Sequence, residues 1–285
     1  MDMLRSYSSA FSRSNITDIL LYDDYSYLDW LIKRYNTKKY ECSYLNYLKA
    51  LYTCLAKDYR CEYVYKNELI HELLKKYGTK NTTVYNEFKV GDSIADIAFF
   101  NGESKAFEIK TEYDTSKRLD KQLLSYSRVF DKCYIVIPEE KLFDYYDIRD
   151  EKTGIILVKR IGRRFMLEEF RPAVENEYIA KDLFMSCLRT TEYEDLIIDK
   201  FGSLPTAKPG HLFKACFEQI NKLSNEDLKQ YFINTIKTRR NNAKTLYQMP
   251  HSLRQTCLAL NLNATKSQIL LEKLNKPINY VLSVS

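Results

Sequence analysis

The sequence predicts an α/β core, with a mixed four- to six-stranded sheet and flanking helices, between two all-helical regions. Short apolar runs rich in β-branched and aromatic residues concentrate between residues 82 and 170, and turn residues bound them, as is typical of buried strands. Before and after this stretch, apolar residues recur at three- and four-residue spacing, as in amphipathic helices. Seven Gly and six Pro are few, which favours short loops. We therefore expect three parts, residues 1–60, 61–170 and 171–285.

The predicted elements follow this division in order. Helices are expected at 15–22, 24–35 and 40–59, and the apolar arc of the next one, 61–77, ends at Gly78. Glu68 lies nearly opposite the centre of that arc, so its spacing predicts exposure to solvent. The first strand spans 82–90, with Val84, Asn86, Phe88 and Val90 on one face by alternation.

Two strands and a helix follow. Asp114-Thr115-Ser116 is a good helix start, and Leu119, Leu123, Tyr126 and Phe130 form the apolar stripe of a helix that ends near residue 130. The uninterrupted apolar run 132–138 predicts a strand buried on both faces and parallel to a neighbour, which makes a βαβ unit with the strand before the helix. Further segments are a helix at 139–151, a hairpin of 154–160 with 163–170, and helices at 177–189, 192–201, 212–223, 225–240, 252–262 and from 266.

Composition excludes several classes of protein. The net charge of +6 and a pI near 8.7 permit a polyanionic partner without requiring one. Seven scattered cysteines and three histidines argue against a zinc site and for a reducing compartment. The chain has no apolar run long enough to span a membrane and no apolar signal core, so we expect a cytoplasmic protein without membrane contact. Phosphate-loop, dinucleotide-fold and serine-hydrolase motifs are absent from the sequence.

Two acidic residues interrupt the apolar runs 94–100 and 106–109, which the turn signal Asn101-Gly102 separates. A three-residue loop would pair residue 100 with 104, 98 with 106 and 96 with 108, bringing the Cα atoms of Asp96 and Glu108 to roughly 5 Å. A two-residue loop would place these acids on opposite faces. Lys110 shares a face with Glu108, roughly 7 Å along the strand.

Such a cluster points to metal chemistry. Two close carboxylates repel each other unless a cation lies between them, and hard oxygen ligands suit Mg²⁺ or Mn²⁺. A neighbouring lysine can position or help deprotonate a water that the metal activates. The alternative is a salt-bridged surface hairpin with Glu108 paired to Lys110 or Lys105.

The pattern Asp96, Glu108-x-Lys110, then Asp114-Thr-x-x-Arg118-Leu-x-x-Gln122-x-x-x-Tyr126 resembles the PD-(D/E)XK nuclease superfamily, in an uncharacterised bacterial branch, over about residues 61–170. The resemblance implies a metal-dependent nuclease, with an endonuclease favoured over an exonuclease. Ala95 stands where the superfamily often has proline.

The resemblance also implies roles for individual residues. Asp96, Glu108 and the backbone carbonyl of Ile109 would hold the metal, and Lys110 would activate the attacking water. Glu68 or Glu87 would supply an additional carboxylate, and Gln122 would support Lys110 or the phosphate. Nucleic acid, most of all DNA, would be the substrate. Candidate contacts to it are Arg118, Lys121, Arg160, Arg163 and Arg164.

Two other classes of function stay open. The first is a catalytically silent module on a nuclease-like fold that binds nucleic acid or protein, for example a regulator in phage defence or in a mobile element. The second is an interaction protein whose helical ends carry the function, through a homodimer or a protein partner. Metal binding and its loss in Asp96→Ala would discriminate the nuclease from both.

Overall fold

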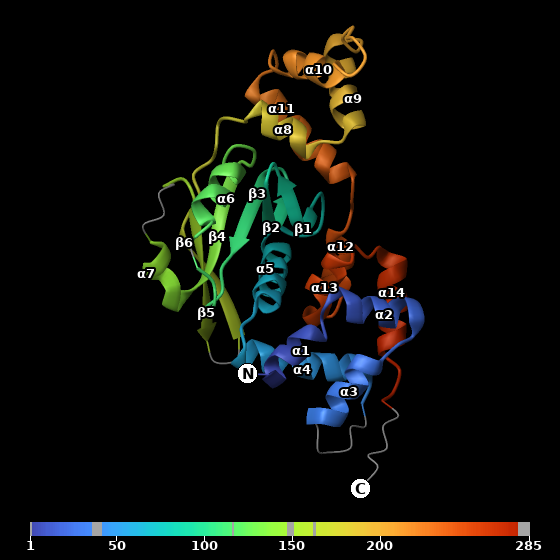
Figure 1. Ribbon diagram of the computed structural model, residues 1–285. Coiled ribbons are helices and arrows are strands. Elements are labelled where there is room, and N and C mark those ends of the chain that lie inside the picture. Colours follow the sequence, from blue (N-terminus) through green and yellow to red (C-terminus); the bar gives the residue numbers. More distant parts are fainter. Residues whose placement is uncertain (1, 36–41, 116, 147–150, 162–163, 279–285) are drawn as a thin grey trace. The chain divides into compact units, whose positions relative to one another are not determined.

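The computed structural model describes residues 2–35, 42–115, 117–146, 151–161 and 164–278 (Figure 1). It confirms the predicted fold class, because a six-stranded mixed sheet is flanked by helices and both terminal regions are helical. Contacts divide the chain into two units. Unit 1 comprises residues 1–79, 160–165 and 242–285, and unit 2 comprises residues 80–159 and 166–241.

Unit 1 is helical. Its N-terminal helices are α1 Asp2–Ser9, α2 Arg13–Tyr22, α3 Ser26–Tyr35, α4 Tyr44–Asp58 and α5 Glu62–Tyr77, and its C-terminal ones are α12 Ala243–Gln248, η2 His251–Leu253, α13 Arg254–Ala259 and α14 Ala264–Leu274. The Ser43 hydroxyl caps α4 by accepting from the Asn46 amide at 3.3 Å. An isolated β-bridge between Ser43 and Pro277 joins the start of α4 to the segment after α14.

Unit 2 contains the sheet, with the order β1-β2-β3-β4-β5-β6, except that the end of β5 and the start of β6 fall in the 160–165 segment of unit 1. The strands are β1 Thr83–Val90, β2 Ser93–Phe100, β3 Ser104–Ile109, β4 Lys132–Pro138, β5 Gly154–Ile161 and β6 Arg164–Arg171. The pairs β1–β2 and β2–β3 are antiparallel, whereas β3–β4 and β4–β5 are parallel. The parallel pair β3–β4 confirms the predicted βαβ unit, whose crossover contains helix α6 Leu119–Tyr126.

The hairpin between β2 and β3 has the predicted register. Phe100 pairs with Ser104 and Ala98 pairs with Ala106, so the loop is the three residues 101–103. Gly102 has a φ of +111°, a value that side-chain-bearing residues rarely adopt, which explains the glycine in this turn. Continuing the register places Asp96 opposite Glu108.

Strand β1 changes face in the middle, which the regular alternation did not predict. Tyr85, Phe88 and Val90 all pack into one core cluster, whereas an unbroken strand would put Tyr85 on the opposite face from the other two. The expected common face of Val84, Asn86, Phe88 and Val90 is therefore wrong. The physical reason lies at Glu87, whose φ of +57° reverses the alternation.

The core of unit 2 lies between the sheet and its helices. Four phenylalanine rings, with centroids 5.6–6.3 Å apart in every pairing, join β1, β2, the end of the α6 segment and α11; they are Phe88, Phe100, Phe130 and Phe232. The helices α8 Lys181–Cys187, α9 Thr190–Phe201, α10 Leu212–Ile220 and α11 Asn225–Thr238 all contribute to this core. Residues 181–238 therefore complete the sheet's hydrophobic cover.

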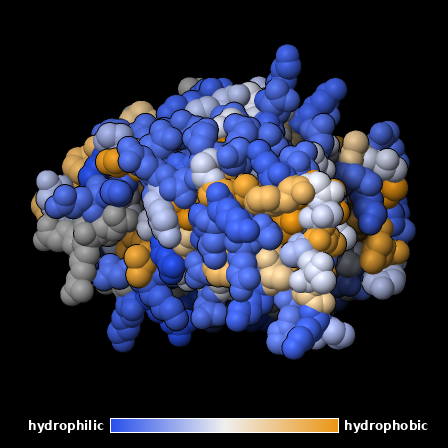
Figure 2. All heavy atoms as spheres, turned by 90° about the horizontal axis from the view of Figure 1, so that it is seen from above, coloured by the Kyte–Doolittle hydropathy of each residue, from blue (hydrophilic) through white to orange (hydrophobic). Residues whose placement is uncertain are grey.

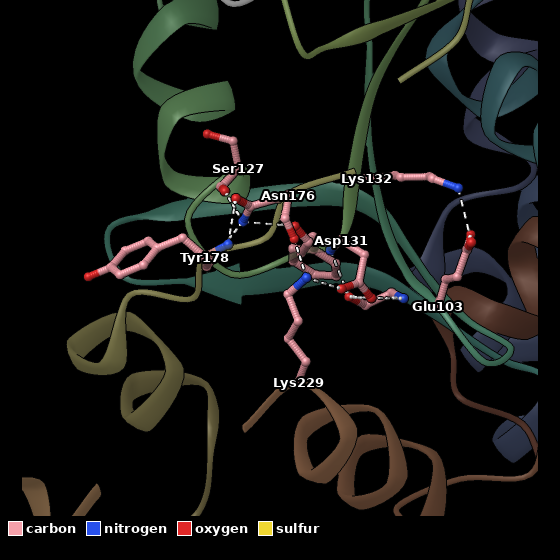
Figure 3. A network of polar contacts seen from close by, with 9 residues as sticks. Glu103, Ser127, Asp131, Lys132, Asn176, Tyr178 and Lys229 are labelled. Carbon is pink, nitrogen blue, oxygen red and sulfur yellow. Dashed lines mark hydrogen bonds and ion pairs between the residues drawn. The ribbon is translucent and has the colours of Figure 1, made fainter. Parts of the chain in front are cut away.

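A buried polar network fastens α11 to the sheet (Figure 3). The Asp131 carboxylate accepts from the backbone amide and hydroxyl of Ser104, both at 2.8 Å, and pairs with the Lys229 ammonium at 3.2 Å. Lys229 also donates to the Asn176 carbonyl, and the Asn176 amide donates to the Asp131 carbonyl at 2.8 Å. These contacts tie α11 and the segment around residue 176 to the β3 and β4 ends.

Several helices are shorter than predicted. The helix expected from Asp114 begins at Leu119, because the Asp114 carboxylate accepts from the amide of Thr111 at 2.7 Å and so closes a preceding turn. The segment 139–151 contains only η1 Glu139–Lys141 and α7 Leu142–Tyr145 among its described residues. The segment before α8 is held without a helix by the Asn176 contacts, whereas the predicted N-cap Ser224 of α11 is confirmed.

Candidate active site

Three carboxylates fall in one row across β1, β2 and β3. Asn86 pairs with Ile97 and Phe88 pairs with Ala95, so Glu87 is the residue of β1 opposite Asp96. The β2–β3 pairs end at Ile97–Phe107, and this register continued by one residue places Asp96 opposite Glu108. Neighbouring strands lie about 4.8 Å apart, so the backbone brings these three acids to adjacent positions.

The backbone is irregular at this row. The register continues past it, from Asn86–Ile97 to Phe88–Ala95, and Glu87 adopts the left-handed backbone conformation. A glutamate in that conformation costs on the order of 1 kcal/mol, and such strained residues concentrate at functional sites. This strain singles out the acid row within the sheet.

Asp96 is fixed by the neighbouring strand. Its Oδ2 accepts a hydrogen bond from the Ile109 backbone amide at 2.8 Å, and the side chain is half-buried. The backbone of Lys110 is fixed from the other side, because its amide donates to the Val136 carbonyl of β4 at 2.9 Å. Residues 109 and 110 are therefore positioned by both neighbouring strands.

Glu108 is buried, with 3% of its surface exposed, and both of its oxygens are engaged. The Lys110 ammonium lies 2.8 Å from Oε1, and the Tyr126 hydroxyl lies 2.9 Å from Oε2. Burial, followed by the negative charge of Asp96, raises the pKa of Glu108, although Lys110 and Tyr126 act in the opposite direction.

The Tyr126 hydroxyl contacts a second acceptor, the Ile94 carbonyl, at 2.5 Å. A hydroxyl has a single proton to donate, so the Ile94 carbonyl and Glu108 Oε2 compete for it. Burial and the Glu108 charge also raise the pKa of Tyr126, so its hydroxyl stays protonated.

Lys110 links the acid row to helix α6. Its ammonium lies 3.4 Å from the amide oxygen of Gln122, one turn before Tyr126 on the same helix. Gln122 is half-buried, as its distance from the apolar stripe predicts, and the stripe residues of α6 are buried. The apolar packing of α6 thus sets the positions of Gln122 and Tyr126 over β3.

The donor set fits a hard divalent cation. Asp96, Glu108 and the Ile109 carbonyl provide oxygen ligands, and Glu87 lies in the same row. Within the described part of the chain, no three His, Cys, Asp or Glu side chains are gathered tightly enough to hold an ion. Mg²⁺ is usually held by one or two carboxylates and keeps several waters, so the number of carboxylates here is compatible with it.

Glu68 is buried, whereas its spacing in the sequence predicts exposure to solvent. It is 6% exposed and belongs to unit 1, where its carboxylate accepts from the Tyr52 hydroxyl at 2.5 Å and lies 3.2 Å from the His251 ring. The prediction failed because α4 and the helices near residue 251 cover that side of α5. The structure thus assigns Glu68 to a polar cluster of unit 1.

The predicted nucleic-acid contacts have different environments. Arg118 and Lys121 are exposed at the start of α6, next to Gln122. Arg160 is also exposed, and it donates to the Lys57 carbonyl of unit 1 at 2.7 Å. Arg163 and the side chain of Arg164 lie outside the described residues.

The sequence did not predict two polar contacts, one at the acid row and one in unit 1. Tyr126 was assigned only to the apolar stripe, yet its hydroxyl contacts Glu108. The His71 ring lies 4.5 Å from the His251 ring, a contact that no apolar pattern or motif predicts. The only available signal for the histidines was their rarity, since the chain has three.

Fold and site together define an α/β protein with a row of carboxylates in its sheet and Lys110 directly after β3. The family model described as Bacteriophage P4 protein cII matches residues 55–263, and the chain belongs to this family. Protein cII of Enterobacteria phage P4 is 27% identical over 177 residues, which cover 61% of this chain and 66% of that protein. The match thus spans slightly less than two thirds of that relative.

One solved structure is also similar. It is a protein of unknown function from Silicibacter pomeroyi, with 14% sequence identity and a TM-score of 0.33, covering 48% of this chain and 90% of that one. None of the helices that the structure describes has the length and apolar character needed to span a membrane.

Proposed function

We propose that this protein is a metal-dependent nuclease that hydrolyses phosphodiester bonds in DNA. The observation that carries the proposal is the Asp96–Glu108 pair, with the Lys110 ammonium 2.8 Å from Glu108. A bound Mg²⁺ or Mn²⁺ would supply an activated water and neutralise charge developing on the phosphate. Since the family is named for a bacteriophage protein, the setting we propose is a phage or another mobile element.

Each residue of the candidate site has a distinct role in this proposal. Asp96 and Glu108 would hold the ion, with the Ile109 carbonyl beside them. Lys110 would orient the attacking water and stabilise the negative charge on the phosphate. Gln122 would hold the Lys110 ammonium, and Tyr126 would hold Glu108 through its hydroxyl.

The DNA backbone would approach along the start of α6. Arg118 and Lys121 are exposed there and would pair with phosphates, so binding should weaken as salt rises. The face in Figure 2 is largely hydrophilic, and its hydrophobic side chains form small separate patches. A homodimer or a protein partner through the helical regions stays a prediction.

A second candidate is a binding module without catalytic activity. The observation that favours it is the engagement of both Glu108 oxygens, by Lys110 and by Tyr126, in a residue that is 3% exposed. In that case Lys110 itself would be the permanent counter-cation of the acid pair, and no metal would bind.

Cleavage of supercoiled plasmid with Mg²⁺ or Mn²⁺ tests the first candidate. We expect the wild type to nick or linearise the plasmid, and Asp96→Asn and Lys110→Ala to lower the initial rate at least about 100-fold. Lys89→Ala is the matched control, because Lys89 is an exposed lysine of β1 in the same sheet. EDTA should abolish cleavage by the wild type.

Calorimetry with Mn²⁺ on the same variants separates the candidates if no plasmid is cut. Mn²⁺ binding that disappears in Asp96→Asn would keep the metal site and direct the search to another substrate. Absence of Mn²⁺ binding in the wild type would favour the binding module. Equal cleavage by the wild type and both site variants would refute the assignment of the site.

A further inference from the structure

A cavity in unit 1 combines cationic, imidazole and aromatic side chains. Its volume is about 700 Å³, within the range of pockets that hold small-molecule ligands. Lys57, Lys75 and Arg160 line it together with His71 and His251. All these residues belong to unit 1, so the cavity is a feature of that unit alone.

The two histidines are held in place at this cavity. His251 lies 3.2 Å from the Glu68 carboxylate, and its backbone carbonyl accepts from the Asn67 amide at 2.7 Å. His71 contacts the Arg254 guanidinium through Nδ1. Burial, the neighbouring His251 and the Arg254 charge lower the pKa of His71. A ligand here would therefore meet imidazoles with defined positions.

Charge at the cavity favours an anion. Three cationic side chains line it against two carboxylates, Glu68 and Glu72. The Glu68 carboxylate is buried and accepts from the Tyr52 hydroxyl at 2.5 Å, while Glu72 lies 3.5 Å from the Lys75 ammonium. Lysine, arginine and histidine donors in one concave site are the usual partners of a phosphate group.

Aromatic side chains complete the cavity. Tyr52 and Phe165 line it beside the cations, and Tyr52 makes an edge-on contact with the His251 ring at 5.6 Å. Tyr52 is 6% exposed, so the half-buried Phe165 is the ring that a nucleobase could stack on, at about 1–3 kcal/mol per base. The combination of phosphate donors and this aromatic side chain matches a nucleotide better than a simple inorganic ion.

We propose that this cavity binds a phosphorylated nucleoside, either as a free nucleotide or as the phosphorylated end of a nucleic-acid strand. The site is separate from the acid row and needs no metal. It stands on the unit 1 cavity alone, so it does not depend on the proposed nuclease activity.

Calorimetric titration in EDTA tests the proposal while the metal-dependent chemistry is silent. The probes are adenosine 5′-monophosphate, adenosine, and an eight-base single strand with a 5′-phosphate or a 5′-hydroxyl. We expect the phosphorylated form of at least one pair to bind at least tenfold more tightly than its unphosphorylated counterpart. Binding of only the nucleotide would identify a free ligand, and binding of only the strand would identify a strand end.

Variants locate the binding in the cavity. Lys75→Ala should weaken binding about tenfold, because it removes one of the cationic side chains that line the cavity. The Lys75 side chain is exposed, so its removal should not impair folding. Lys76→Ala is the matched control on the same helix, since Lys76 does not line the cavity, and Asp96→Asn should also bind normally. His251→Gln gives a second test at a histidine that lines the cavity. Failure of every phosphorylated probe at millimolar concentration, or equal binding by wild type and Lys75→Ala, would overturn the proposal.

Discussion

At the scale of single residues, Glu108 experiences opposing influences. Burial and the Asp96 charge favour its protonated form, while the Lys110 ammonium at 2.8 Å favours its ionised form. Because the pKa of Glu108 is raised in the folded protein, the folded state binds this proton more tightly than the unfolded chain. The contribution of Glu108 to stability is therefore present below its ordinary pKa of 4.5 and is lost as the pH rises through the folded value.

This sign predicts that Glu108→Gln stabilises the metal-free protein at pH 7. Glutamine keeps the shape and removes the buried charge, so its melting temperature in EDTA should exceed that of the wild type. The difference should shrink toward pH 4, where the wild-type carboxyl is protonated in both states. Thermal unfolding between pH 4 and pH 8 measures it.

The matched control is Glu218→Gln, which removes an exposed carboxylate on α10 of the same unit. Its melting temperature should follow that of the wild type across the range. A lower melting temperature for Glu108→Gln at pH 7 would mean that the ion pair with Lys110 outweighs the cost of burial.

Residue-scale prediction from the sequence succeeded where the determinants were local. The Asn101-Gly102 turn predicted the β2–β3 hairpin, and of the two loop lengths left open, the structure has the three-residue loop that aligns Asp96 with Glu108. The burial of Glu68 could not be predicted, because Tyr52 and His251 contact it from segments far away in the chain. Periodicity predicts which face of a helix is polar, but not which other helices will cover that face.

At the scale of elements, the same distinction separates β4 from β1. The continuous apolar run of β4 correctly predicted its bounds and its parallel pairing. The change of face in β1 follows from the single left-handed residue Glu87, which no apolar pattern reveals. Helix α6 began later than expected because Asp114 could cap either a helix or a turn, and it accepts from Thr111.

The contact between β4 and β5 supplies an element-scale prediction. A Cβ atom on Gly154 would lie 2.5 Å from the Tyr134 ring and 2.7 Å from the Ala173 backbone nitrogen. Tyr134 cannot easily move aside, because its ring stacks on Phe107 at 5.4 Å and its hydroxyl donates to Glu169 at 2.7 Å. Gly154→Ala should therefore cost about 1–3 kcal/mol of unfolding free energy.

Urea denaturation measures that cost as a lower midpoint with an unchanged slope. Val174→Ala is a suitable control, since Val174 is exposed beside the same region and its truncation should change stability by less than about 0.5 kcal/mol. An unchanged midpoint for Gly154→Ala would show that the strands can separate enough to admit a methyl group.

At the scale of the whole molecule, the sequence predicts a central sheet between helical ends, and the structure confirms that class. What the sequence could not predict is which helices share a core. Phe232 of α11 packs with Phe88 and Phe100 of the sheet, whereas residues 242–285 are grouped with the N-terminal helices. Such pairings depend on side-chain shape across long separations, which local patterns do not record.

Two units with separate cores should unfold in separable steps, and Trp30 gives a probe for one of them. It is the single tryptophan of the chain and lies on α3 of unit 1, so its fluorescence reports on that unit.

Asp131→Ala removes the buried partner of Lys229 in unit 2, which should cost about 3–5 kcal/mol there. We expect the circular-dichroism transition to shift to lower denaturant while the fluorescence midpoint of Trp30 stays in place. Asp182→Ala, which removes an exposed carboxylate of α8, should move neither transition. An equal shift of both probes in Asp131→Ala would contradict independent unfolding, because a loss confined to unit 2 would then have been transmitted in full to unit 1.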